Sequence, residues 1–92
     1  MNLKEAIDRF NLAGFHTKPI KTLTIEIEGF HVGKDIRHVE GEGDYIIGDF
    51  FTIINDNGIW TAHISSQGIL KSSESLKEVV DAVCNYYGIS NQ

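Results

Sequence analysis

The chain has 92 residues, of which 41% are hydrophobic and 23% charged, with a formal net charge of −5. These values are ordinary for a globular protein and favour one domain, residues 1–92, with a thin core. No apolar run approaches the roughly 20 residues of a membrane span, and the acidic start MNLKEAIDRF does not resemble a signal peptide. A single cysteine, Cys84, excludes an internal disulfide, so we expect a reducing, cytoplasmic location without membrane partners.

The N-terminal residues predict a helix that ends before Gly14. Asn2 can cap this helix, and Glu5 stands three residues later, as in a capping box. A stripe of apolar residues follows helical spacing: Leu3, Ala6, Ile7 and Phe10. Gly14 supplies the left-handed residue that commonly ends a helix, and Pro19 disfavours its resumption.

One clear strand and one irregular stretch follow this helix. The segment KTLTIEIE, residues 21–28, alternates apolar and polar side chains, a pattern typical of an antiparallel strand with one buried face. Residues 29–43 show the least regular pattern in the chain, with at most a short strand at 36–40. We therefore expect a loop over most of 29–43.

A β-hairpin is predicted in the middle of the chain. The segment YIIGDFFTIIN, residues 45–55, is apolar on both faces and predicts a central strand, and Asn57-Gly58 predicts a tight turn after it. A two-residue loop pairs Phe51 with Ile64, Ile53 with Ala62 and Asn55 with Trp60. A four-residue loop slides this register by two residues and keeps the same faces together. We expect one side to face the core: Phe51, Ile53, Trp60, Ala62 and Ile64. The other side carries Phe50, Thr52, Ile54, Thr61, His63 and Ser65. A short strand at 69–72 closes the sheet.

The last helix has strong start and stop signals. Ser75 and Glu78 form an S-x-x-E capping box, and Gly88 suits the end, with Ile89 folding back on Cys84. Its apolar stripe is Leu76, Val79, Val80, Val83 and Tyr87. No helix separates the strands, so the sequence predicts an α+β fold. We expect a mostly antiparallel four- to five-stranded sheet in α-β-β-β-β-α order, with both helices on one face.

Negative charge is concentrated in the middle of the chain. Residues 26–56 hold eight acids and two bases, whereas the remainder has six bases and five acids. Such a middle repels a phosphate backbone and attracts a basic partner or a cation. The element order resembles that of a double-stranded-RNA-binding domain, but the last helix begins SSESLKE where that module needs basic residues. We therefore expect no nucleic-acid partner.

The acidic stretch HVEGEGD, residues 38–44, is the main candidate for a cation site. In an extended chain its four polar side chains share one side: His38, Glu40, Glu42 and Asp44. Carboxylates and imidazole suit a hard or borderline cation, yet the spacing matches no calcium loop. We predict no bound metal and no cofactor. A small-ligand or divalent-metal domain that uses this loop with His31 or His63 is kept as the second hypothesis.

Catalytic motifs are missing from the sequence, since neither a G-x-S-x-G elbow nor a phosphate-binding loop occurs. Phe50 and Ile54 lie on the face of the predicted sheet away from the core, where a partner or a second copy would cover them. The leading hypothesis is a small non-catalytic cytoplasmic protein-interaction domain with a basic partner, and with homodimerisation as a further expectation. Charge and size suit an adaptor or toxin-neutralising role, as in small bacterial or phage proteins. The candidate partner-binding residues are Glu40, Glu42, Asp44, Phe50 and Ile54.

Overall fold

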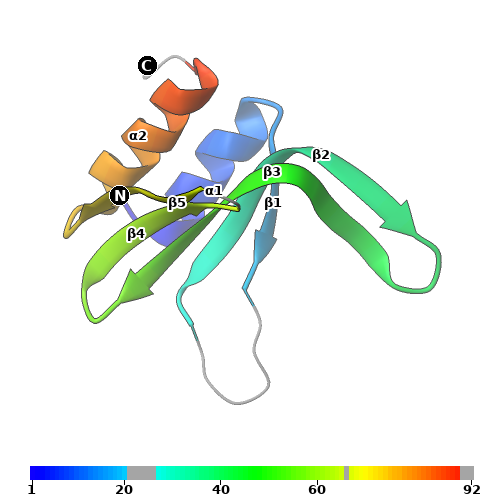
Figure 1. Ribbon diagram of the computed structural model, residues 1–92, viewed down its shortest axis with the longest axis horizontal. Coiled ribbons are helices and arrows are strands. Elements are labelled where there is room, and N and C mark those ends of the chain that lie inside the picture. The colour runs from blue at the N-terminus through cyan, green and yellow to red at the C-terminus, as the bar shows by residue number, and fades with distance from the viewer. Residues whose placement is uncertain (21–26, 66, 90–92) are drawn as a thin grey trace.

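The computed structural model describes residues 1–20, 27–65 and 67–89, and it confirms the predicted α+β architecture. The elements are α1 (Leu3–Leu12), β1 (His16–Pro19), β2 (Gly29–Val39), β3 (Gly43–Asp56), β4 (Ile59–Ile64), β5 (Gly68–Ser73) and α2 (Leu76–Tyr87). The five strands form one antiparallel sheet in the order β1-β2-β3-β4-β5. Both helices lie on one face of this sheet (Figure 1), with α1 against β1 and β2 and α2 against β4 and β5. Within the described ranges, no helix has the length and apolar character needed to cross a membrane.

The helix ends follow the sequence signals, with one difference. Asn2 Oδ1 accepts from the Glu5 amide at 2.8 Å, and the Glu5 carboxylate accepts from the Asn2 amide at 3.2 Å, so the first capping box is complete. At α2, the Ser75 hydroxyl accepts from the Glu78 amide at 3.4 Å, but Glu78 Oε2 accepts from the Ser73 hydroxyl at 2.6 Å. The second box is therefore only half formed, because Ser73 takes the place of the Ser75 amide.

The end of α2 confirms the predicted stop. Gly88 is left-handed with φ 75°, and the Ile89 amide donates to the Cys84 carbonyl at 2.8 Å. Cys84 is fully buried, and burial raises the pKa of its thiol. The thiol is thus a core group with little thiolate at neutral pH.

The core lies between the helices and the facing side of the sheet. The helices bury Ala6, Phe10, Leu76, Val79, Val80, Val83 and Cys84, and the sheet buries Phe30, Val32, Phe51, Ile53, Trp60, Ala62 and Ile64. None of these side chains is more than 8% exposed. Phe10 and Phe30 pack with ring centroids 6.0 Å apart, which joins α1 to the centre of the sheet.

The predicted β3–β4 hairpin is confirmed, and its register is that of the two-residue loop, one of the two loop lengths that the sequence allowed. Asn57 and Gly58 have φ of 53° and 89°, the left-handed pair of a two-residue turn. Opposite residues are Phe51 and Ile64, Ile53 and Ala62, and Asn55 and Trp60, as the pattern indicated. All five side chains assigned to the core side are buried.

The first half of the sheet differs from the prediction. Residues 21–26 of the strand expected at 21–28 lie outside the described residues, and the next two, Ile27 and Glu28, are not in a strand. Residues 16–19, for which no strand was predicted, form the edge strand β1, and β2 runs through the stretch expected to be irregular. That expectation was wrong because the outer half of β2 has no buried face, so its sequence lacks the alternation that reveals a strand.

The strand β3 is central over only part of its length. Residues 51–54 pair with both β2 and β4, whereas residues 43–47 pair only with residues 35–39 of β2 among the described residues. The prediction that the whole of 45–55 is central is thus wrong for its first residues. Together with their connection, residues 34–49 form a two-stranded ribbon that leaves the sheet and curves away at the right of Figure 1. We call this ribbon the arm and the rest of the fold the body.

Candidate functional site

Two glycines at the base of the arm bend it out of the plane of the body. Gly48 and Asp49 together oppose the single residue Lys34, and Gly48 is left-handed with φ 74°. This is a β-bulge with glycine at its left-handed position, which bends a strand and increases its twist. On the partner strand, an added Cβ at Gly33 would lie 2.6 Å from Ile46 Cγ2. Because Gly33 has no side chain, Ile46 on the β3 strand of the arm can pack directly against the backbone of β2.

The bend creates two adjoining cavities between the arm and β1. The inner cavity has a volume of about 460 Å³ and is lined by Lys18, Pro19, His31, Tyr45, Ile46 and Phe50. The outer cavity, of about 470 Å³, is lined by Asn11, His16 and Thr17 on one side and by Ile36, Glu42, Gly43 and Asp44 of the arm on the other. Lys18 and Ile46 line both cavities, so we treat them as one site and call it the groove.

Lys18 crosses the middle of the groove from β1 to the arm. Its Nζ donates to the Asp44 carbonyl at 3.0 Å and lies 4.8 Å from the centre of the Tyr45 ring. An ammonium group has three N–H donors, and the Asp44 carbonyl takes one of them. Lys18 thus fixes the arm relative to β1 and retains donors for a ligand.

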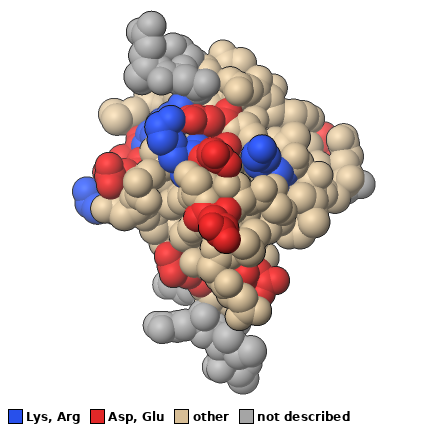
Figure 2. Space-filling view, turned by 90° about the vertical axis from the view of Figure 1, so that its left-hand side faces the viewer, with Lys and Arg blue, Asp and Glu red and all other residues tan. Residues whose placement is uncertain are grey.

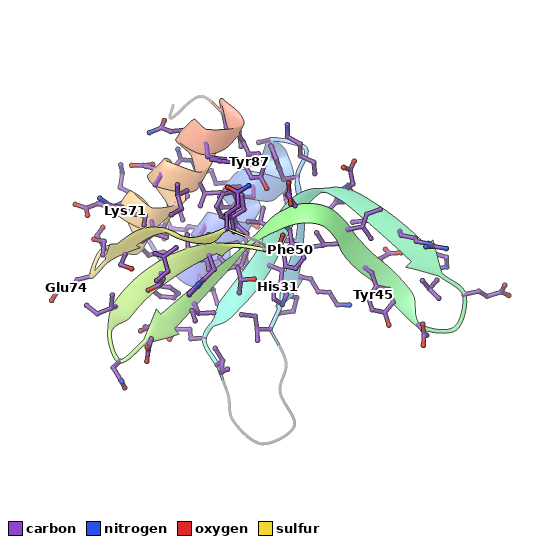
Figure 3. All side chains as sticks on the ribbon, in the orientation of Figure 1. His31, Tyr45, Phe50, Lys71, Glu74 and Tyr87 are labelled. Atoms are coloured by element: carbon purple, nitrogen blue, oxygen red, sulfur yellow. The ribbon has the colours of Figure 1, made fainter. Side chains whose placement is uncertain are left out.

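His31 forms the floor of the inner cavity. Its Nδ1 is hydrogen-bonded to Thr52 Oγ1 at 2.8 Å, and its ring meets the Phe50 ring edge-on at 5.6 Å (Figure 3). Burial, and to a smaller extent the charge of Lys18, lowers the pKa of His31 below its ordinary value of 6.5. At neutral pH the inner cavity therefore presents an uncharged imidazole beside aromatic rings.

The acidic side chains lie at the far end of the arm. Glu40 and Glu42 stand at the turn between β2 and β3, where the Glu42 amide donates to the Val39 carbonyl at 3.0 Å. Asp44 Oδ1 is 2.8 Å from His38 Nδ1, and both side chains are more than half exposed. No three His, Cys, Asp or Glu residues of the described ranges come together as a metal site. The groove therefore has carboxylates at one end without a preformed cation site among them.

The five predicted partner-binding residues are only partly brought together. Glu42 and Asp44 line the outer cavity and Phe50 lines the inner one, so three of the five belong to the groove. Glu40 is exposed at the turn of the arm. Ile54 pairs with Gly29 and Thr61 within the body and is not among the lining residues of either cavity.

Sequence reasoning missed the role of β1 and of the glycines in the site. None of Lys18, Ile46 and Gly33 was singled out from the sequence as a site residue. Glycines in both strands of a hairpin, in VGKDI and in IIGDF, were the available signal for a bend. That signal needs the pairing of β2 with β3, which the sequence pattern did not indicate.

The base of the arm is also held against α2 by Tyr87. Its ring packs on Phe51 and Phe15 with centroid distances of 5.4 and 4.5 Å, and Lys34 Nζ lies 5.5 Å from its centre. Burial, with smaller effects of Tyr86 and Asp49, raises the pKa of Tyr87 to about 12. The hydroxyl therefore stays protonated, and Tyr87 supports the arm as a packing residue.

The opposite side of the molecule has a different charge pattern. Figure 2 shows basic and acidic side chains next to each other on the side that carries β5 and α2. Asp81 joins two of them, at 2.7 Å from Arg9 Nη1 and 2.8 Å from Lys77 Nζ. On this side of the molecule, Asp81 is thus partly neutralised by two basic side chains.

Comparison of the chain with protein-family models, with curated proteins and with solved structures gave no match. The fold and the groove define a two-layer α+β domain whose sheet extends into a bent, acidic ribbon.

Proposed function

We propose that the chain is a non-catalytic protein-interaction domain that binds a basic partner through the arm. The observation that carries the proposal is the combination of apolar and acidic groups on this one ribbon. Ile36, Tyr45 and Ile47 are 39%, 42% and 42% exposed, and residues 34–49 hold five carboxylates and two bases. Exposed apolar side chains rimmed by charge are typical of a surface that another protein covers.

The polar groups of the groove are held in position before a partner binds. Lys18 is held by the Asp44 carbonyl and the Tyr45 ring, and His31 is held by Thr52. A binding surface that is fixed in advance loses less conformational entropy when the partner binds, which supports the proposal. An adaptor or toxin-neutralising role in the cytoplasm is the form of the proposal that suits a small acidic domain.

The size of the inner cavity favours a small organic ligand as the second candidate function. Small-molecule sites commonly measure about 300–1,000 Å³, and the inner cavity of about 460 Å³ lies in this range. A divalent cation is less well supported, because His38 and Asp44 pair without a third ligand from the described residues. A ligand of this kind would raise the melting temperature of the isolated protein.

Homodimerisation would use a different surface from the arm. The edge strand β5 pairs with β4 on one side, and its Ile69 and Leu70 are 63% and 39% exposed. An exposed apolar edge strand is a template for pairing with a second copy. The oligomeric state measured by analytical ultracentrifugation, for the wild type and for Leu70→Lys, tests this part of the proposal.

The proposed function is tested by affinity capture from the lysate of the source organism at low and high salt. The arm variant carries Glu40→Gln, Glu42→Gln and Asp44→Asn. A matched control removes three exposed carboxylates of the body, with Glu28→Gln, Asp56→Asn and Glu74→Gln; Glu74 lies at the end of the sheet far from the arm (Figure 3). We expect a basic protein that the wild type and the control retain at low salt and the arm variant loses. Equal capture by all three proteins would contradict the proposal.

A further inference from the structure

We propose that the groove binds an extended peptide segment of the partner that carries an apolar side chain and, two to four residues away, a lysine or arginine. The apolar side chain enters the inner cavity, and the basic side chain reaches Glu42 and Asp44. This inference rests on the proposed function and adds the chemical nature of what is recognised.

The shape of the groove favours an extended ligand over a compact one. The two cavities share Lys18 and Ile46, so a ligand can run from one into the other. Asp44 and Phe50 are six residues apart on β3, which corresponds to about 20 Å of extended strand. An extended peptide that reaches both Asp44 and Phe50 therefore spans at most about six residues, and the shared lining residues Lys18 and Ile46 bring the two cavities closer together than that.

The inner end of the groove suits an apolar or aromatic side chain. Its walls come from Pro19, Tyr45, Ile46 and Phe50, and its floor is the uncharged His31. The rings of His31 and Phe50 meet edge-on, and a further aromatic or branched aliphatic side chain can pack against such a pair. Burial of such a group removes apolar surface of both molecules from water and supplies the affinity.

The outer end of the groove suits a cation. Glu42 and Asp44 are both exposed, and Asp44 has His38 as its neighbour at 2.8 Å. A guanidinium or ammonium group of the partner would gain charge-assisted hydrogen bonds to these carboxylates. An acidic ligand would instead be repelled at this end.

Lys18 helps to assign the two side chains of the peptide to the two ends of the groove. Its ammonium lies 4.8 Å from the centre of the Tyr45 ring, so it repels a basic side chain from the inner cavity, whereas the carboxylates of Glu42 and Asp44 attract one at the outer end. Its remaining N–H groups can donate to a main-chain carbonyl of the peptide as it crosses the middle of the groove. This assignment holds for either direction of the peptide chain.

The test is selection of peptides from a phage-displayed random dodecapeptide library on the full chain. We expect enriched peptides to contain an apolar residue followed or preceded, at two to four positions, by lysine or arginine. A fluorescein-labelled enriched peptide is then titrated with each protein variant and followed by fluorescence anisotropy. Amide ¹H–¹⁵N spectra of every variant show whether it is folded before it is titrated.

The variants separate the two ends of the groove. We expect Tyr45→Ala to weaken binding about tenfold and the pair Glu42→Gln with Asp44→Asn to weaken it about fivefold. Ile69→Ala, which removes an exposed apolar side chain from β5, serves as the control and should change binding less than about twofold. Lys18→Met replaces Tyr45→Ala if the tyrosine variant is not folded.

Three results would overturn the inference: no enriched motif, enrichment of acidic peptides, or binding that the groove variants leave unchanged. Its failure can be told apart from failure of the proposed function. A cellular partner that is lost by the arm variant but retained by Tyr45→Ala at full affinity would uphold binding by the arm and reject the groove as the site. A wild type that captures no basic protein would reject both.

Discussion

The body and the arm are built from the same two strands, yet only one of them has a core. Ile53 and Ile47 both belong to β3, and they are 0% and 42% exposed, respectively. In the body, alternate residues of β2 and β3 face the two helices, whereas beyond its base the arm has no helix packed along either face among the described residues. The difference shows that an apolar residue on a long strand has a stabilising role only where another layer covers it. Apolar residues beyond that limit are available for binding.

The largest effect that this comparison predicts is the contrast between Ile53→Ala and Ile47→Ala. The first substitution leaves a cavity in a fully buried site and should lower the free energy of unfolding by about 3 kcal/mol. The second removes a half-exposed side chain from the arm and should lower it by less than about 1 kcal/mol. Urea denaturation followed by circular dichroism measures both. Similar losses for the two variants would show that the arm is part of the cooperative core.

The next effect concerns the approach of the arm to the body. Gly33→Ala places a Cβ 2.6 Å from Ile46 Cγ2 and 3.1 Å from Phe50 Cβ, so the arm must move away. We expect a loss of about 1–3 kcal/mol in stability, typical of overpacking, and weaker peptide binding in the groove. Urea denaturation and the anisotropy titration measure the two effects.

A double variant is the control for this steric explanation. Gly33→Ala combined with Ile46→Ala removes the atom nearest to the added Cβ, so the two losses in stability should be less than additive. Strictly additive losses would indicate that Gly33 matters for a reason other than contact with Ile46.

The body could be predicted from the sequence because its signals are local. Capping residues, the Asn57-Gly58 turn and the alternation along β3 and β4 each depend on neighbours in the chain. The length of one turn fixes the register of a whole hairpin, so the sequence left only two registers open, and the structure has the one that pairs Phe51 with Ile64.

The arm could not be predicted in the same way. Its strands have no buried face to impose alternation, and its bend depends on which residues oppose Gly48 and Gly33 across the ribbon. The groove requires in addition that β1 lie beside β2, and the four residues of β1 carry no strand pattern of their own. Three of the predicted binding residues do line the groove, since charge and exposure can be predicted from the local sequence. Lys18 and Ile46 could not be predicted, because their place in the groove depends on long-range contacts.

A smaller effect is expected where the two helices of the body are joined. Hydrogen bonds from Lys77 and then from Arg9 lower the pKa of Asp81 below its ordinary value of 3.8. A carboxyl group whose pKa is lower in the folded than in the unfolded state stabilises the fold at every pH above its unfolded pKa. This stabilisation is lost as the pH falls through the pKa of the folded state. Asp81→Asn should therefore cost about 1 kcal/mol at pH 7 and much less at pH 2.

The control for Asp81 is the exposed pair of Lys4 and Asp8 on α1. This pair has the same i, i+4 spacing, but Asp8 is 53% exposed at its side chain whereas Asp81 is 25% exposed. Asp8→Asn should change the free energy of unfolding at pH 7 by less than about 0.5 kcal/mol. Equal effects of the two substitutions, measured by thermal unfolding across the pH range, would show that the link between the helices adds nothing.

The smallest effect comes from His31, where the arm and the body meet. Its pKa is lowered by burial and by Lys18, so the unfolded chain takes up the proton first as the pH falls. The free energy of unfolding should therefore decrease below pH 6.5 and level off below the folded pKa, by a few tenths of a kcal/mol after solvent screening. His31→Asn should remove this dependence of stability on pH. Thr52→Val should lower the stability but leave its dependence on pH in place. Because the arm covers part of His31, the dependence of stability on pH should also be weaker in Gly33→Ala. If that dependence is unchanged in Gly33→Ala while peptide binding is lost, the arm has moved without exposing His31 to solvent.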